Sequence, residues 1–246
     1  MSKSKKLLDS VAARWSRLGA MVNVKPAART PDVERLLLDT ARVASANSRL
    51  FILAASWLAQ YGDYVAKHRL ARLARDELES EDRPTLGFLL EWAKDRGHSN
   101  GSRFNLAIDA CGSAQDHRPL LDIERRNSLF TRLAEQRASV LSRKWGRWTT
   151  DFDIKKDALR PAAWIAKHNP SLVERALTGG DLLASVLAEC EADANAIDSE
   201  AELARRCGAS RPAVRSAIRR LELAGRVHML RTRRNHEIHL PKRVVA

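Results

Sequence analysis

The sequence predicts a mainly α-helical protein, in which a helical N-terminal body is followed by a C-terminal module of three helices and a β-hairpin. Apolar residues recur at helical spacings of three and four through most of residues 30–178. Strand patterns occur only after residue 225. With 246 residues, of which 44% are hydrophobic and 30% charged, the chain can form one large domain or two smaller ones.

The net charge of +13 is concentrated at the two ends of the chain. Residues 1–29 hold seven Lys or Arg and one acid, and residues 199–246 hold twelve basic and four acidic side chains. The 24 basic and 25 acidic side chains of residues 30–198 nearly cancel. A near-neutral body with two basic ends favours an anionic partner such as nucleic acid. The alternative is that the basic ends only keep the chain in solution.

We expect three parts: a basic amphipathic arm at 1–29, a helical body at 30–178 for oligomerisation or partner binding, and the C-terminal module at 181–246. We expect the apolar side of the arm to pack on the body or on a partner subunit, and a helix on a membrane surface is the alternative. The MSKSKK opening and the apolar run at 50–59 are not typical of a signal peptide or a membrane span, so no membrane partner is expected. The apolar side of the arm consists of Leu7, Leu8, Val11, Trp15 and Leu18.

Four helices are predicted in the first half of the body. Thr30 is the expected N-cap of the first, with Glu34 as an early acid. The helix over 47–61 is apolar nearly all round, which is typical of a central core helix. A charged helix over 65–78 follows, and Asp82 caps the fourth.

A long helix is predicted from Leu121 to Trp145. Its apolar stripe is typical of a core helix, and a dimer seam is the alternative. Two short helices are predicted at 160–168 and 171–177, followed by a linker or a sharp turn at 178–180. No strand is predicted before residue 225. The stripe of the long helix consists of Ile123, Phe130, Ala134, Leu141 and Trp145.

The three helices of the C-terminal module each have a start signal. Asp181 caps the first, and Ser199-x-x-Glu202 forms a capping box at the second. A tight turn at 208–209 precedes Ser210, which caps the third helix. Gly225 ends this third helix.

The third helix divides into a buried face and a basic stripe when its residues are projected at about 100° per residue. The stripe consists of Arg211, Arg215 and Arg219, and we expect it to be free, whereas Ser216 and Arg220 lie further round. The residues expected to be buried are Val214, Ala217, Ile218 and Leu221.

Two short strands are predicted at 227–230 and 236–240, joined by a basic tip. This order of elements is the layout of a winged helix-turn-helix, in which a helix enters the DNA major groove and the hairpin follows the backbone or the minor groove. The candidate contacts with double-stranded DNA are Ser210, Arg211, Arg215, Ser216, Arg219 and Arg220 on the helix, and Arg231, Arg233, Arg234 and Asn235 on the hairpin.

The segment SEAELARRCGASRPAVRSAIRRLELAGRV, residues 199–227, resembles the winged helix-turn-helix of GntR-type bacterial transcription regulators. The shared features are the Ser-x-x-Glu-Leu-Ala opening, the Ser-Arg-x-x-Val-Arg start of the third helix and the Leu-x-x-x-Gly close. The resemblance implies that Arg211 and Arg215 approach bases or phosphates. The family normally carries this module at the N-terminus and a Gly-rich hairpin tip, whereas here the module is C-terminal and the tip contains Arg-Arg-Asn.

Other combinations of reactive residues do not form a known catalytic or metal-binding motif. The spacing of His236 and His239 puts them on opposite faces of a strand, which does not favour a metal site. Asp151 and Asp153 match part of a nuclease or nucleotidyltransferase acidic pair, but a solvated loop is the favoured interpretation. No P-loop, GxSxG or HExxH motif occurs, so no catalytic residue, cofactor or metal is expected. The three cysteines contain no CxxC pair, and buried thiols are expected.

The sequence therefore favours a non-enzymatic, sequence-specific double-stranded DNA-binding protein, a bacterial-type transcription regulator of the cytoplasm and nucleoid. The body would form a homodimer or bind a protein partner, because paired half-sites are usual for such regulators. One alternative is an adaptor or antitoxin-like protein whose body binds a partner, with DNA binding for autoregulation, replication or defence. The other is a nucleic-acid enzyme that uses Asp151 and Asp153.

Overall fold

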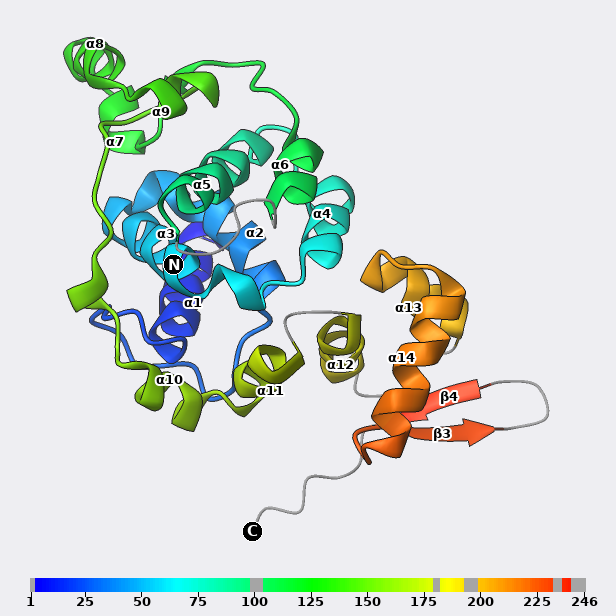
Figure 1. The fold of residues 1–246 in the computed structure, drawn as a ribbon. Coiled ribbons are helices and arrows are strands. Elements are labelled where there is room, and N and C mark those ends of the chain that lie inside the picture. The colour runs from blue at the N-terminus through cyan, green and yellow to red at the C-terminus, as the bar shows by residue number, and fades with distance from the viewer. Residues whose placement is uncertain (1–2, 98–103, 179–181, 193–198, 232–235, 240–246) are drawn as a thin grey trace.

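The chain is mainly α-helical, as expected (Figure 1). The computed structural model describes residues 3–97, 104–178, 182–192, 199–231 and 236–239. In these ranges the α-helices are α1 (Lys3–Arg17), α2 (Val33–Val43), α3 (Ser48–Tyr61), α4 (Lys67–Asp76), α5 (Arg83–Arg96), α6 (Asn105–Cys111), α7 (Asp122–Arg125), α8 (Ser128–Arg137), α9 (Val140–Lys144), α10 (Ala162–His168), α11 (Pro170–Thr178), α12 (Leu182–Ala192), α13 (Glu200–Cys207) and α14 (Arg211–Leu223). The strands are β1 (Arg118–Pro119), β2 (Arg147–Trp148), β3 (His228–Arg231) and β4 (His236–His239).

The body, α2 to α11, and the arm helix α1 share one core that contains Trp15, Trp57 and Trp92. Trp15 and Trp57 meet edge to face with ring centroids 5.6 Å apart, and Trp92 stacks on Phe152 at 4.3 Å. The almost wholly apolar α3 lies among the other helices of this core, as its sequence predicts (Figure 1). Helices α7, α8 and α9 lie at the end of the body farthest from the hairpin β3–β4 (Figure 1).

The N-terminal arm packs on the body through α1. Val11, Trp15 and Leu18 are fully buried in the body core. The indole Nε1 of Trp15 donates to Thr40 Oγ1 over 2.8 Å, and Arg14 forms an ion pair with Asp39 at 2.9 Å. The expected packing of this arm on the body is therefore confirmed.

The first body helix begins later than predicted. Its N-cap is Asp32 rather than Thr30, because the Asp32 carboxylate accepts a hydrogen bond from the Arg35 backbone N–H over 3.1 Å. Asp82 does occupy the N-cap position of α5, but its side chain makes no capping hydrogen bond. The predicted N-cap Asp181 and the residues Gly179 and Gly180 before it lie outside the described residues.

The prediction of one long helix from 121 to 145 is wrong. The segment forms three short helices, because two polar side chains within it cap new helix starts. Asn127 accepts from the Leu129 backbone N–H, and Ser139 accepts from the Ser142 backbone N–H. The expected stripe is consequently divided: Trp145 is buried, whereas Ile123 is 66% exposed.

The expectation that no strand precedes residue 225 is also wrong. Strands β1 and β2 form a two-residue parallel pair, with Arg118 opposite Arg147. Two residues are too few for a periodic signal in the sequence. The Arg147 side chain is buried and donates to Asp116 Oδ1 and to the Glu81 carbonyl oxygen.

A second core lies in the C-terminal part of the chain. Helices α12, α13 and α14 pack against one another, and the hairpin β3–β4 follows α14. The two strands are antiparallel, with Met229 opposite Ile238. The residues of this core are Leu183, Val186, Leu187, Cys190, Leu203, Ala204, Cys207, Val214, Ala217, Ile218, Leu221 and Val227.

Candidate nucleic-acid interface

The starts of α13 and α14 and the turn between them are fixed by local capping. The Ser199 hydroxyl accepts from the Glu202 backbone N–H over 3.1 Å, and the Ser210 hydroxyl accepts from the Ala213 backbone N–H over 3.4 Å. Gly208 has φ +66°, in the left-handed region that favours glycine. Gly225 has φ +65° just after α14, where the sequence predicts a stop. The expected caps at Ser199 and Ser210 are therefore confirmed.

The reciprocal half of the predicted capping box is replaced by ion pairs. The Glu202 carboxylate accepts from Arg205 Nη2 at 2.7 Å and from Arg206 Nε at 2.8 Å. These hydrogen bonds lower the pKa of Glu202 to about 2. Glu202 thus holds two of the arginines at the end of α13 instead of bonding back to Ser199.

The buried face of α14 is the one that the sequence predicts. Val214, Ala217, Ile218 and Leu221 are each at most 4% exposed. All four belong to the second core. The packing of this face directs the opposite side of α14 toward solvent.

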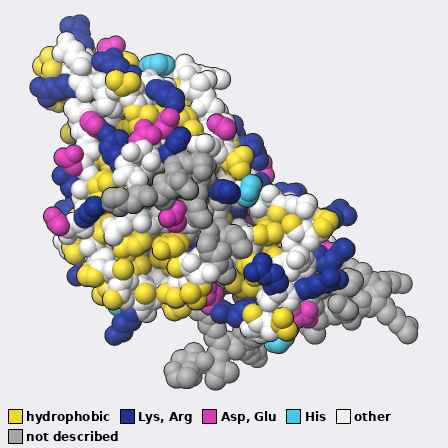
Figure 2. Space-filling view, in the orientation of Figure 1, with side chains coloured by type: hydrophobic (Ala, Val, Ile, Leu, Met, Phe, Trp, Pro, Cys, Tyr) yellow, Lys and Arg dark blue, Asp and Glu magenta, His cyan; other side chains and the backbone are white. Residues whose placement is uncertain are grey.

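Most of the candidate DNA contacts on α14 lie together on that exposed side. Ser210, Arg211, Ser216, Arg219 and Arg220 are exposed. Among the described residues, Arg211, Arg219 and Arg220 have no carboxylate within ion-pair distance. Figure 2 shows Lys and Arg side chains gathered over the part of the surface where Figure 1 places α13 and α14. Three cations on one exposed helix side can attract a polyanion.

Arg215 does not stand free, contrary to the expectation for the basic stripe. Its Nη2 donates to Glu200 Oε2 over 2.7 Å, and its Nε donates to the same oxygen over 2.9 Å. The hydrogen bond to Glu200 raises the pKa of Arg215. The physical reason is that Glu200, in the first turn of α13, meets the start of α14 where the two helices pack.

The hairpin contacts can be placed only in part. Arg231 is the last residue of β3 and lies opposite His236. Arg233, Arg234 and Asn235 lie outside the described residues. They stay predictions.

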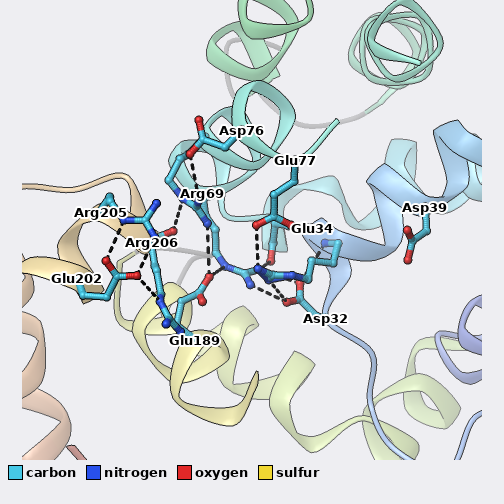
Figure 3. Close-up of polar contacts among 12 residues, drawn as sticks. Asp32, Glu34, Asp39, Arg69, Asp76, Glu77, Glu189, Glu202, Arg205 and Arg206 are labelled. Carbon is cyan, nitrogen blue, oxygen red and sulfur yellow. Dashed lines mark hydrogen bonds and ion pairs between the residues drawn. The ribbon is translucent and has the colours of Figure 1, made fainter. Parts of the chain in front are cut away.

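A buried ion network joins the C-terminal helices to the body, and we call this contact the junction (Figure 3). Arg69 of α4 is fully buried and donates to Asp32 and Glu34 at the start of α2 and to Glu189 of α12. Arg175 of α11 donates to both oxygens of Glu34. Burial acts to raise the pKa values of both body carboxyls, but the arginines outweigh it: the pKa of Asp32 falls to about 2, and that of Glu34 is also lowered.

The turn between α13 and α14 packs against α4. Arg72 Nε donates to the Arg206 carbonyl oxygen over 2.5 Å. A Cβ built on Gly208 would lie 2.9 Å from the His68 carbonyl oxygen, so the backbone of the turn is in close contact with α4. An ion pair between Arg226, which follows α14, and Glu174 of α11 links the far end of the same module to the body.

A cavity of about 220 Å³ lies beside this junction. It is formed by the start of α2, by α11 and by α12, so both cores contribute to it. Asp32 and Arg175 of the ion network form part of its wall. Its other lining residues are Thr30, Pro31, Val33, Ser171, Leu172, Glu174, Ala184, Leu187 and Ala188.

The other candidate residues occupy separate places. Asp151 is exposed and forms an ion pair with Arg96 at 2.6 Å, in the non-helical segment that also holds Asp153. Among the described residues no group of three or more His, Cys, Asp or Glu side chains could hold a metal ion. In the same ranges, no helix is both long and apolar enough to cross a membrane. Cys111, Cys190 and Cys207 are buried, as expected.

The sequence interpretation missed the buried arginines of α4 and α11. Arg69 and Arg72 stand in the run KHRLARLARD, which looks like a solvated charged helix. A signal was present in the neighbouring positions, because Leu70 directly follows Arg69 and Leu73 directly follows Arg72, and the two leucines share one side of the helix.

No match for this chain is found among protein-family models, curated proteins or solved structures.

Proposed function

We propose that residues 181–246 form a winged helix-turn-helix that binds double-stranded DNA sequence-specifically, and that the protein is a non-enzymatic transcription regulator. The observation that carries the proposal is the exposed side of α14, where Arg211, Arg219 and Arg220 stand without a carboxylate partner among the described residues. The buried face of the same helix is fixed by four apolar residues. A helix presented in this way fits the major groove, where arginine makes bidentate contacts with guanine.

The resemblance to GntR-type regulators supports the same role for α13 and α14. The arrangement of α12, α13, α14 and the antiparallel β3–β4 pair agrees with the module that the resemblance implies. In this proposal α14 is the recognition helix, and Arg231, Arg233, Arg234 and Asn235 of the hairpin contact the backbone or the minor groove.

A titration of labelled duplex DNA, followed by fluorescence anisotropy at several salt concentrations, tests the proposal. The double variant Arg211→Ala, Arg219→Ala should weaken binding by about tenfold or more, since each lost bidentate contact removes roughly 1–3 kcal/mol. Arg132→Ala is the matched control, because Arg132 is exposed on α8, far from α14 in Figure 1. Equal binding by all three proteins would contradict the role of α14.

A second candidate function is supported by the far end of the body. Ile123, Leu129, Phe130 and Val140 of α7, α8 and α9 are 46–88% exposed. Exposed apolar side chains close together are typical of a protein-binding surface. In this candidate the body binds a second copy or a partner protein, and DNA binding serves autoregulation. Sedimentation of the wild type and of Phe130→Asp tests it: a dimer that becomes a monomer supports self-association through this end.

A further inference from the structure

We propose that the DNA-binding surface extends from α14 onto the body, where Lys67 and His68 of α4 contact the phosphate backbone beside the recognition helix. This inference rests on the proposed function, since it concerns the same double-stranded DNA. It assigns a DNA-binding role to body residues that lie about 140 positions before α14 in the chain.

The turn between α13 and α14 packs on the first two turns of α4. The Arg206 carbonyl oxygen accepts from Arg72, and a Cβ built on Gly208 would meet the His68 carbonyl oxygen at 2.9 Å and the Arg72 Cβ at 3.7 Å. Lys67 and His68 are the first two residues of α4, so they lie close to this turn.

The start of α14 lies close to the turn that packs against α4. Arg211 follows Gly208 by three residues, so their Cα atoms are no more than about 11 Å apart. The major groove is about 12 Å wide, and a phosphate strand runs along each edge. With the start of α14 in the groove, this distance is short enough for the N-terminal end of α4 to reach a flanking phosphate strand.

The two exposed residues at the N-terminal end of α4 can donate hydrogen bonds to phosphate. Lys67 and His68 are both exposed, and within the described residues neither forms an ion pair. The neighbouring Arg69 and Arg72 are instead paired with carboxylates: Arg69 with Asp32, Glu34 and Glu189, and Arg72 with Asp76 of its own helix and with Glu189 at 3.8 Å. Lys67 therefore offers an ammonium group to a phosphate, and His68 offers a ring N–H donor.

The contacts of the junction hold α4 in place relative to α14. The contacts of Arg69 with Glu189 and of Arg72 with Arg206 hold α4 against the module that contains α14. A group that is held in place before binding loses less conformational entropy when it contacts DNA. The body thus adds phosphate contacts and fixes the orientation of α14 relative to the duplex.

The test compares the salt dependence of duplex binding among four full-length proteins: wild type, Lys67→Ala, Arg75→Ala and Arg219→Ala. Lys67→Ala should lower the slope of log affinity against log salt by about 1 and weaken binding about fivefold near 0.1 M salt. Arg75→Ala is the matched control, because Arg75 is an exposed cation on α4 about 12 Å further from the N-terminal end. It should leave both the slope and the affinity within about twofold of wild type.

The outcomes separate the inference from the proposed function. If wild type does not bind the duplex, the proposed function fails and the inference fails with it. If wild type binds and Arg219→Ala weakens binding, but Lys67→Ala matches wild type or matches Arg75→Ala, only the inference is overturned. A gain of affinity in Lys67→Ala would also overturn it. Thermal unfolding of each variant shows whether a loss of binding reflects a loss of fold.

Discussion

Arg69 of α4 and Glu189 of α12 form a buried ion pair that joins the two cores of the molecule. Arg69 Nε donates to Glu189 Oε1 over 2.7 Å, and the two side chains are 0% and 2% exposed. The residues are 120 positions apart in the chain. Because the same guanidinium binds Asp32 and Glu34, the position of α12 is coupled to the start of α2.

Removal of the Arg69 side chain should strongly destabilise the protein. Arg69→Ala leaves three carboxylates without their shared cation, and loss of one partner from a buried ion pair costs about 3–5 kcal/mol. Urea unfolding followed by circular dichroism measures the change in the free energy of unfolding. The control Arg132→Ala, at an exposed position, should change it by less than about 0.5 kcal/mol. A loss below about 1 kcal/mol for Arg69→Ala would show that the junction does not hold the fold.

The stability of the junction should fall at acidic pH. Asp32 has a pKa of about 2 in the folded protein against an ordinary value of 3.8, and the pKa of Glu34 is lowered from 4.5. Lowered folded pKa values stabilise the protein above the unfolded values, and this stabilisation is lost as the pH falls from about 4.5 toward 2. Asp32 alone contributes about 2 kcal/mol of this change.

Urea unfolding at a series of pH values measures this effect. Asp32→Asn should flatten the loss of stability between pH 4.5 and pH 2, since asparagine does not titrate and is still a good N-cap. A slope that is unchanged in Asp32→Asn would exclude Asp32 as its source.

Two glycines with nearly the same φ angle can separate backbone strain from the contact between the turn and α4. Gly208 and Gly225 have φ +66° and +65°, so alanine at either position costs roughly 1–2 kcal/mol of strain. An added Cβ at Gly208 would also meet the His68 carbonyl oxygen at 2.9 Å, whereas nothing lies within 4 Å at Gly225. Gly208→Ala should therefore lower the free energy of unfolding by at least about 1 kcal/mol more than Gly225→Ala. Equal losses would mean that the turn does not rest on α4.

The ion pair of Arg215 with Glu200 predicts a gain of DNA affinity. Glu200→Gln removes a carboxylate from the exposed side of the α13–α14 pair and releases the Arg215 guanidinium for phosphates or bases. A solvent-exposed pair of this kind contributes little to stability, so the fold should be preserved. Duplex binding should strengthen by about two- to fivefold. Arg215→Ala should weaken it, and weaker binding by Glu200→Gln would mean that the pair is needed to position Arg215.

The sequence predicts much of the candidate site because its signals there are local. The caps Ser199 and Ser210, the stop at Gly225 and the buried face with Val214 and Ile218 all depend on residues within one or two helical turns. The pairing of Arg215 with Glu200 could not be predicted, because it depends on how two helices cross. The signal for it was only that an acid stands in the first turn of α13.

The sequence does not predict the junction, since its partners come together only in the folded chain. In the sequence, the charge of Arg69 indicates an exposed helix face, because its partners Glu34 and Glu189 lie far from it in the chain. The prediction of a long helix over 121–145 was wrong for the opposite reason. Its apolar periodicity is real, but Asn127 and Ser139 cap new helices within the segment. Periodicity indicates which residues share a face, and local side-chain hydrogen bonds decide where the helices end.

The central claim is that α14 recognises particular DNA sequences, and sequencing of the genomic DNA fragments retained by the immobilised protein tests it most directly. At moderate salt the account predicts a shared sequence motif among the retained fragments. The enrichment should disappear in the double variant Arg211→Ala, Arg219→Ala and persist in Arg132→Ala. Retained fragments with the composition of bulk DNA, for wild type and variants alike, would contradict the claim.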